Sequence, residues 1–391
     1  MKKKHKKRIV GIISLVVVLA AVFIPAQQHC MRRVDHNQIR LAGFYAEEKN
    51  SLDMVVMGAS ETYYGYFADE AYKTAGITSY PYSFQYNPVS LWKYELKEIL
   101  KRQKPKVLIV EVNGAGYGTG YDKEKLYSEA AIRILSDSMP MSKDKKKMIK
   151  ELEHFRKDSE VSYYWPFLKF HTQWFYDGMR TDLKDLEKRG YSPLKGVFSK
   201  IRTKKHNKEM EIPKNIKPIE MNSKAEKSLK EFMVLCKKSG IKHVLFVRFP
   251  HKVTNARQLW RHKRYLKVGE VIKAGGCEYI DFSKRKKEIG LIWNKDFVDT
   301  EHLNVYGAKK LTNYIVKYVQ EKYGLKRTKL SKANKKKWDT SVKYINAYYK
   351  YYDNYPKRHS KLRIKLKRFT DCSRMIDRLA RFIQKNNKKK A

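Results

Sequence analysis

Short apolar runs alternate with amphipathic segments along most of this chain, and this alternation restricts its fold more than any other feature. Four runs predict buried strands: residues 52–58, 105–112, 241–249 and 277–282. The segments 90–102, 228–240 and 307–319 carry apolar residues at helical spacing. Buried strands separated by amphipathic helices indicate a parallel sheet with helices on both faces. We therefore predict an α/β fold, a three-layer α/β/α sandwich.

The N-terminal segment predicts a membrane anchor. Residues 9–26 carry no charge and follow the basic block MKKKHKKR. As a helix this run would be about 27 Å long, close to the thickness of a bilayer core. The basic block is expected to stay in the cytoplasm, which places the rest of the chain outside. A cleaved signal peptide is the alternative, but the run is long for one and no small-x-small cleavage site ends it.

The composition divides the chain into four parts. Residues 1–28 form the basic flank and the predicted transmembrane helix, and residues 29–50 a polar linker. Residues 51–324 form the predicted catalytic domain, with an insertion at about 120–221 that could shape a substrate groove. Residues 325–391 form a basic helical extension, with 23 Lys or Arg against 4 Asp or Glu.

The charge of the whole chain restricts its partners. The 86 Lys and Arg residues exceed the 40 Asp and Glu residues by 46. Such a field favours polyanions: anionic lipid, an anionic cell-envelope polymer or nucleic acid. The predicted orientation places the domain outside the plasma membrane, which argues against nucleic acid. Four scattered Cys residues do not make a disulfide framework, which fits the surface of a Gram-positive bacterium.

Two short motifs suggest a catalytic site. Ser60 follows the first predicted strand in the sequence Gly58-Ala59-Ser60, and the carboxyl ends of parallel strands are where active sites form. Asp299 and His302 lie three residues apart before the helical segment 307–319. An Asp that fixes one imidazole nitrogen leaves the other to accept a serine proton. The alternative is an ordinary helix start, with Asp299 or Thr300 as its cap and His302 on the surface.

The two motifs together resemble those of the SGNH/GDSL hydrolase family. VVMGASE stands near the front of the domain and DFVDTEHLNVYGAKKLT near its end. The likeness covers about 53–323 and is greatest to the membrane-anchored branch, which includes DltD-like and polysaccharide O-acetylation proteins. It implies Ser60 as nucleophile, His302 as base and Asp299 as the residue that orients the base. Glu61 matches the Gly-x-Ser-Glu form of the DltD-like proteins, its alternative being a solvated carboxylate at a helix start.

The resemblance is weaker in the middle of the domain. It implies oxyanion donors from two further blocks, and only Asn113 is recognisable there. The dipeptide Asn113-Gly114 is also a common turn. Gln85 and Asn87 stand where the family has a Gly, and we expect Asn87 to bind substrate.

Three further residues are candidates for the site because of their positions in the sequence. Arg248 ends a predicted strand and is the second expected substrate-binding residue, its alternative being a surface ion pair. His171 and His251 are further bases without a matching carboxylate motif.

The expected function is acyl transfer through serine, without a metal or cofactor. The resemblance implies O-acylation of a cell-envelope polysaccharide or teichoic acid, and suggests a membrane-bound O-acyltransferase as the acyl donor partner. Two alternatives remain. One is a carbohydrate esterase that removes acyl groups, and the other is a non-catalytic protein that binds anionic polymer on the same scaffold.

Overall fold

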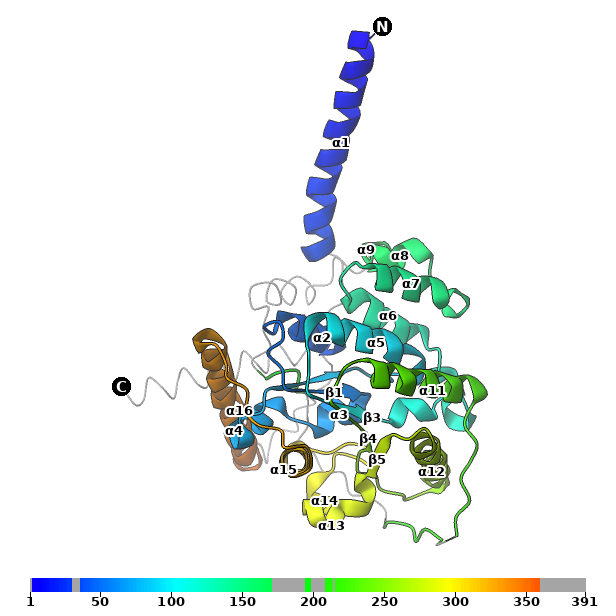
Figure 1. Ribbon diagram of the computed structural model, residues 1–391, viewed down its shortest axis with the longest axis vertical. Coiled ribbons are helices and arrows are strands. Elements are labelled where there is room, and N and C mark those ends of the chain that lie inside the picture. The colour runs from blue at the N-terminus through cyan, green and yellow to red at the C-terminus, as the bar shows by residue number, and fades with distance from the viewer. Residues whose placement is uncertain (1, 30–35, 171–193, 198–207, 214, 359–391) are drawn as a thin grey trace, which may run out of the picture.

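A five-stranded parallel sheet forms the centre of the computed structural model (Figure 1). The order across the sheet is β2-β1-β3-β4-β5, and every neighbouring pair is parallel. The strands are β1 (Met54–Gly58), β2 (Ser79–Ser83), β3 (Val107–Glu111), β4 (His243–Arg248) and β5 (Glu278–Asp281). The structure therefore confirms the predicted α/β fold with a parallel sheet. It describes residues 2–29, 36–170, 194–197, 208–213 and 215–358.

Helices pack on both faces of the sheet (Figure 1). On one face α5 (Val89–Arg102) lies beside α11 (Ser223–Lys238), which in turn contacts α12 (Ala256–Ala274). On the other face α15 (Val305–Tyr323) contacts both α3 (Ser60–Gly65) and α4 (Ala68–Ala75). The remaining short elements near the sheet are η1 (Asn113–Gly116), η2 (Gly120–Lys125), η5 (Phe282–Arg285), α13 (Lys286–Ile289) and α14 (Trp293–Asp296).

The apolar stripes expected from the sequence form the core. In α11 the residues Leu229, Phe232, Met233 and Cys236 are buried, and in α15 so are Ala308, Leu311, Ile315 and Val319. Asn304 caps α15, because its side chain accepts hydrogen bonds from the backbone N–H groups of Tyr306 and Gly307. Gly324 ends the helix in the left-handed conformation.

The described part of the insertion packs mainly against α5 and α2 (His36–Ala46). It contains α6 (Glu129–Ser138), α7 (Lys143–Glu151), η3 (Glu153–Phe155), α8 (Glu160–Tyr164) and α9 (Phe167–Phe170). Residues 194–197 return to the body, where the buried Lys195 ammonium lies 2.7 Å from the Glu47 carboxylate. The Gly196 carbonyl accepts a hydrogen bond of 2.9 Å from Arg40.

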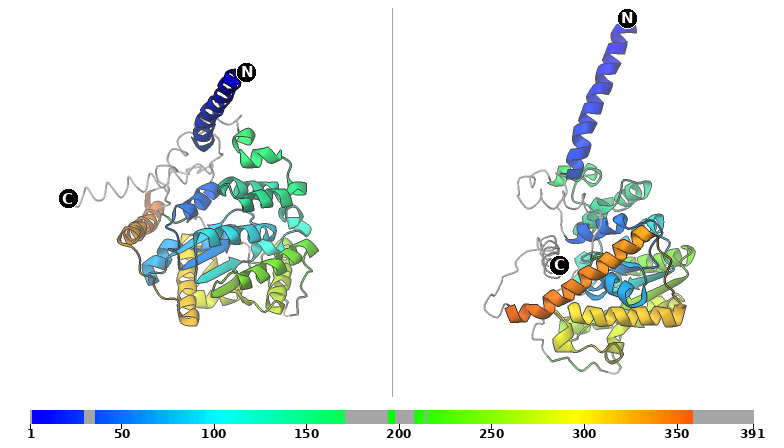
Figure 2. Two further views of the ribbon diagram at one scale, coloured as in Figure 1. Left: turned by 45° about the horizontal axis from the view of Figure 1, so that its top comes forward. Right: turned by 90° about the vertical axis from the view of Figure 1, so that its left-hand side faces the viewer.

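The beginning of the predicted basic extension belongs to the body of the protein. Helix α16 (Lys332–Arg358) lies beside α4 (Figure 2). Trp338, Ile345 and Tyr348 are fully buried in the same core as the sheet residues. The charged residues of this segment therefore occupy the outer side of a docked helix. Residues 359–391, with the rest of the extension, lie outside the described residues.

Helix α1 (Lys2–His29) extends away from the body (Figure 1). Its large apolar side chains between Ile9 and Val22 are exposed. Within the described part of the chain, no helix is both long enough and apolar enough to cross a membrane.

Candidate active site

Ser60 stands at the turn from β1 into α3, two residues beyond the carboxyl end of the strand. The turn is tight at Gly58, where an added Cβ would come within 2.3 Å of Thr62 Oγ1 and 2.6 Å of Glu111 Cβ. Only glycine fits between these groups, which explains the Gly at this position of the motif. The turn presents Ser60 at the carboxyl edge of the sheet, where it borders a cavity of about 490 Å³.

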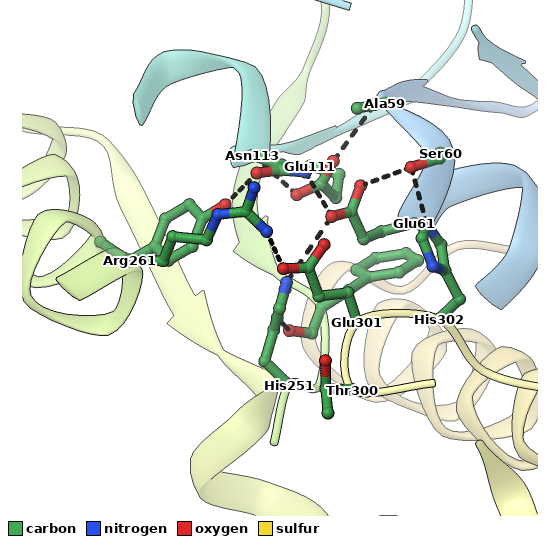
Figure 3. Close-up of polar contacts among 12 residues, drawn as sticks. Ala59, Ser60, Glu61, Glu111, Asn113, His251, Arg261, Thr300, Glu301 and His302 are labelled. Atoms are coloured by element: carbon green, nitrogen blue, oxygen red, sulfur yellow. Dashed lines mark hydrogen bonds and ion pairs between the residues drawn. The ribbon is translucent and has the colours of Figure 1, made fainter. Parts of the chain in front are cut away.

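His302 and Asp299 meet Ser60 at this edge. Figure 3 shows the contact between His302 and Ser60. His302 Nε2 lies 2.8 Å from Ser60 Oγ, and His302 Nδ1 lies 2.9 and 3.0 Å from the two oxygens of Asp299. Asp299 Oδ1 also accepts hydrogen bonds from the backbone N–H groups of Glu301 and His302. The three side chains thus meet as the motif order predicted. Asp299 does not cap α15, because Asn304 does.

This geometry fixes the direction of the hydrogen bonds. The Asp299 carboxylate can only accept, so His302 Nδ1 carries the hydrogen and Nε2 is left as the acceptor. Ser60 Oγ lies 3.3 Å from Glu61 Oε2, which is longer than an ordinary O–H···O bond and longer than its 2.8 Å contact with His302. The serine hydroxyl therefore donates to the imidazole. A base poised to accept the proton of a nucleophile is the arrangement that serine acyl transfer requires.

Glu61 is buried rather than solvated, which corrects its expected alternative as an exposed carboxylate. It accepts a hydrogen bond from the Asn113 amide and lies 3.6 Å from His251 Nε2. Burial alone would raise the pKa of Glu61, but the close contact with His251 and the charge of His302 lower it to about 2. Glu61 is therefore an anion beside the Ser60–His302 pair, where it stabilises an imidazolium.

Asn113 borders the cavity just after β3, as expected for an oxyanion donor. Its side-chain oxygen accepts a hydrogen bond from the Tyr265 hydroxyl, and its amide nitrogen donates to Glu61. These two partners fix the orientation of the carboxamide. The nitrogen carries two hydrogens, and the contact with Glu61 uses one of them. Donation of the other to an oxyanion stays a prediction.

Glu111 connects the two turns that carry Ser60 and Asn113. It is fully buried at the end of β3, where its oxygens accept hydrogen bonds from the backbone N–H groups of Ala59 (3.2 Å) and Asn113 (2.6 Å). Burial and the negative charge of Glu61 raise the pKa of Glu111. Sequence reasoning missed this role. Its only signal was a carboxylate near the end of a predicted strand whose centre is apolar.

The two residues expected to bind substrate do not line the cavity. Asn87 is fully buried and donates to the Gly58 carbonyl (3.0 Å) and to Glu95 (2.8 Å), so it supports the nucleophile turn from behind. Arg248 does end β4 at the carboxyl edge, but its side chain is buried. Its guanidinium lies 3.4 Å from Asp281, 3.0 Å from His262 Nδ1 and over the Tyr265 ring. The backbone position of a residue leaves open where its side chain turns, and both of these side chains turn into the interior of the protein.

Other residues supply the cationic wall of the cavity. Lys125, Arg257 and Arg261 line it, together with Tyr63, Tyr64, Tyr86 and Tyr117. Among the described residues of the insertion, only Lys125 reaches the cavity. Of the alternative bases, His251 is buried, with its Nδ1 2.5 Å from the Phe249 carbonyl. His171 lies outside the described residues. Within the part of the chain that the structure describes, no group of three His, Cys, Asp or Glu side chains is arranged to hold a metal ion.

The contact between Arg248 and His262 predicts a pH-dependent stability. Burial and the positive charge of Arg248 lower the pKa of His262 from its usual 6.5 to about 4. Between pH 6.5 and pH 4, His262 therefore stays unprotonated in the folded state but takes up a proton in the unfolded chain. Stability is present above pH 6.5 and is lost as the pH falls towards 4. We expect this group to contribute a loss of roughly 2 kcal/mol over that window, after allowance for solvent screening.

The measurement is the free energy of unfolding at several pH values for the wild type and His262→Gln. Glutamine keeps an acceptor for Arg248 but does not titrate. The variant should therefore lose less stability than the wild type between pH 6.5 and 4. Parallel curves for the two proteins would show that His262 does not carry this dependence.

No protein-family model matches this chain, and a search of curated proteins finds no similar sequence.

Proposed function

We propose that this protein is a serine acyltransferase or esterase of the SGNH type, anchored in the plasma membrane with its α/β domain outside. The observation that carries the proposal is the chain of contacts Asp299–His302–Ser60, at 2.9 and 2.8 Å, bordering a cavity at the carboxyl edge of a parallel sheet. The five-stranded parallel sheet with helices on both faces fits a three-layer sandwich of that family.

The reaction follows from the hydrogen-bond directions. Ser60 Oγ attacks the carbonyl carbon of an ester or thioester, and His302 Nε2 takes the serine proton. The carbonyl oxygen becomes an oxyanion, and we expect the Ser60 N–H and the Asn113 amide to stabilise it, at about 3–4 kcal/mol for a well-placed donor. The intermediate collapses to an acyl-serine as the leaving group departs with the proton from His302. Asp299 holds the imidazole orientation throughout and stabilises its charged form.

The second half of the reaction repeats these steps with another nucleophile. A sugar or polyol hydroxyl gives up its proton to His302 and attacks the acyl-serine, which moves the acyl group to the acceptor and returns the proton to Ser60. Water in the same place gives an esterase. The open, tyrosine-lined cavity supports a polyhydroxylated acceptor, because aromatic faces pack against the C–H faces of sugars. We propose transfer onto an envelope polysaccharide or teichoic acid, with a membrane-bound O-acyltransferase as the acyl donor.

The decisive experiment asks whether Ser60 is reactive. A fluorophosphonate probe forms a covalent bond only with an activated serine. The purified full-length chain should take up one probe at Ser60, as located by peptide mass spectrometry, and should hydrolyse an activated ester. A folded protein that takes up no probe and turns over no ester would favour the alternative of a non-catalytic polymer-binding protein.

The location proposal depends on the N-terminal segment. Residues 9–26 are uncharged, and the described apolar side chains of α1 are exposed rather than packed on the body. Such a surface is stable in lipid and unfavourable in water. The basic residues before it should remain in the cytoplasm. The extracytoplasmic surface would then meet anionic lipid or polymer, to which a chain with a net charge of +46 is attracted.

Protease accessibility checks this orientation. A protease added to intact protoplasts should digest the α/β domain, because the domain lies on the outer face. A cytoplasmic marker protein should survive the same treatment and should disappear only after the membrane is broken. Protection of the domain together with the marker would place it in the cytoplasm and would return nucleic acid to the candidate partners.

A further inference from the structure

The cavity that holds Ser60 carries more cationic than anionic side chains at one end. Lys125, Arg257 and Arg261 line it, and we call these three the cationic wall. Behind them Asp122 is fully buried. Its carboxylate forms ion pairs with the Lys125 ammonium at 2.8 Å and with the Arg261 guanidinium at 2.9 Å. Asp122 also binds the buried Arg264 at 2.7 Å.

The charges at this end do not balance. Glu301 pairs with Arg261, so three cations, Lys125, Arg261 and Arg264, share the carboxylates of Asp122 and Glu301. The charges of the arginines outweigh the effect of burial and hold the pKa of Asp122 well below its usual value. Asp122 therefore stays ionised and keeps its cations in place. Arg257 adds a fourth cation, which is exposed and lies 5.4 Å from the Tyr121 ring. Among the described residues, no carboxylate forms an ion pair with Arg257.

The start of α12 adds a second, independent source of positive potential. Asn255, Arg257 and Gln258 line the cavity, so the N-terminal end of this 19-residue helix borders it. The first turn contains no acidic side chain. Backbone N–H groups at a helix start and the helix dipole both favour an anion there. An arginine with no carboxylate partner at such a position is suited to a phosphate or a carboxylate, since its planar fork binds either group through two hydrogen bonds.

We propose that the cationic wall and the start of α12 form a subsite for an anionic group, a phosphate or a carboxylate, carried by the molecule whose hydroxyl exchanges the acyl group. The inference rests on the proposed function, because it assigns this end of the cavity to the acyl acceptor. Arg257 contacts the anion directly, while Asp122 positions Arg261 and Lys125. The Lys125 ammonium also lies 4.6 Å from the Tyr86 ring and 5.3 Å from the Tyr117 ring, so the anion and the sugar or polyol body would lie next to each other.

The test measures binding without turnover. The full-length Ser60→Ala chain in non-ionic detergent is titrated at low salt, by calorimetry, with three short oligomers. A glycerol phosphate trimer supplies phosphates, a galacturonic acid trimer supplies carboxylates, and maltotriose is neutral. At least one anionic trimer should bind about tenfold more tightly than maltotriose, and the stronger of the two identifies the anionic group. Added salt should weaken only the anionic binding.

Two variants in the Ser60→Ala background locate the site. Arg257→Gln should weaken the anionic trimer about tenfold and leave maltotriose unchanged. Lys317→Gln removes one charge from an exposed part of α15 that does not line the cavity, and should change neither. Equal binding of anionic and neutral trimers, or equal losses in the two variants, would overturn the subsite.

This outcome is separate from the fate of the proposed function. Anion selectivity that depends on Arg257, in a protein whose Ser60 takes up no probe, keeps the subsite and rejects the acyl transfer. A reactive Ser60 in a protein without anion selectivity would keep the proposed acyl transfer and reject the subsite.

Discussion

Ser60→Ala should abolish labelling by a fluorophosphonate probe and should lower ester turnover by roughly four orders of magnitude or more. Alanine removes the hydroxyl that lies 2.8 Å from His302 Nε2. His302→Ala should have a similar effect, because a serine hydroxyl without its base is a weak nucleophile. The two residues act as one unit, so the double variant should be little worse than either single variant.

The controls separate loss of chemistry from loss of fold. Ser223→Ala changes an exposed serine at the start of α11 and should label like the wild type. Near-ultraviolet circular dichroism and the unfolding midpoint should be the same for all these proteins. Full turnover by folded Ser60→Ala would mean that another group does the chemistry and that the contacts around His302 serve structure alone.

Trp338→Ala should destabilise the whole protein by about 3–5 kcal/mol. Trp338 is fully buried on α16, with its ring 5.0 Å from the Tyr72 ring and 4.1 Å below the Lys195 ammonium. Its removal leaves a large cavity between α16 and α4. Lys343→Ala, an exposed change in the same helix, should stay within about 0.5 kcal/mol of the wild type. Urea denaturation of the full-length chain in detergent gives both values.

Truncations extend the same argument. A chain that stops after Arg358 keeps α16 and should still label at Ser60, whereas a chain that stops before Lys332 exposes the surface that Trp338, Ile345 and Tyr348 cover. The second protein should be poorly folded. Equal stability of Trp338→Ala and Lys343→Ala, together with a stable protein lacking α16, would show that this helix is only an appendage.

The sequence predicted four of the five strands and failed at β2. Its residues are Ser79-Tyr80-Pro81-Tyr82-Ser83, without the run of aliphatic side chains that marks β1, β3 and β4. Pro81 has no N–H to donate to a sheet. It is tolerated because β2 is an edge strand that pairs only with β1. Such an assignment depends on the neighbours of a strand, which a single sequence does not contain.

The site residues also divide into those that the sequence predicted correctly and those whose place only the structure gives. The positions of Ser60, Asp299 and His302 followed from motif order, because each lies in or beside a short turn whose backbone fixes the side chain. Arg248 has a long side chain and Asn87 lies in the interior of the protein. In both cases packing decides the direction of the side chain. Arg257 and Arg261 could not be found from the sequence. They stand in a helix with many charged residues, and only the placement of α12 beside η2 and the 299–302 turn brings them to the cavity.

The distance along the chain between the two reacting groups has a consequence for the order of events during synthesis. Ser60 and His302 are 242 residues apart, and they meet only when the turn at residues 299–302 docks beside the end of β1. Contacts of such high sequence separation form late and slowly, because loop-closure entropy opposes them until most of the sheet has assembled. An incomplete or misfolded chain thus presents a serine with no base, so the chain would not cleave acyl esters before its folding is complete.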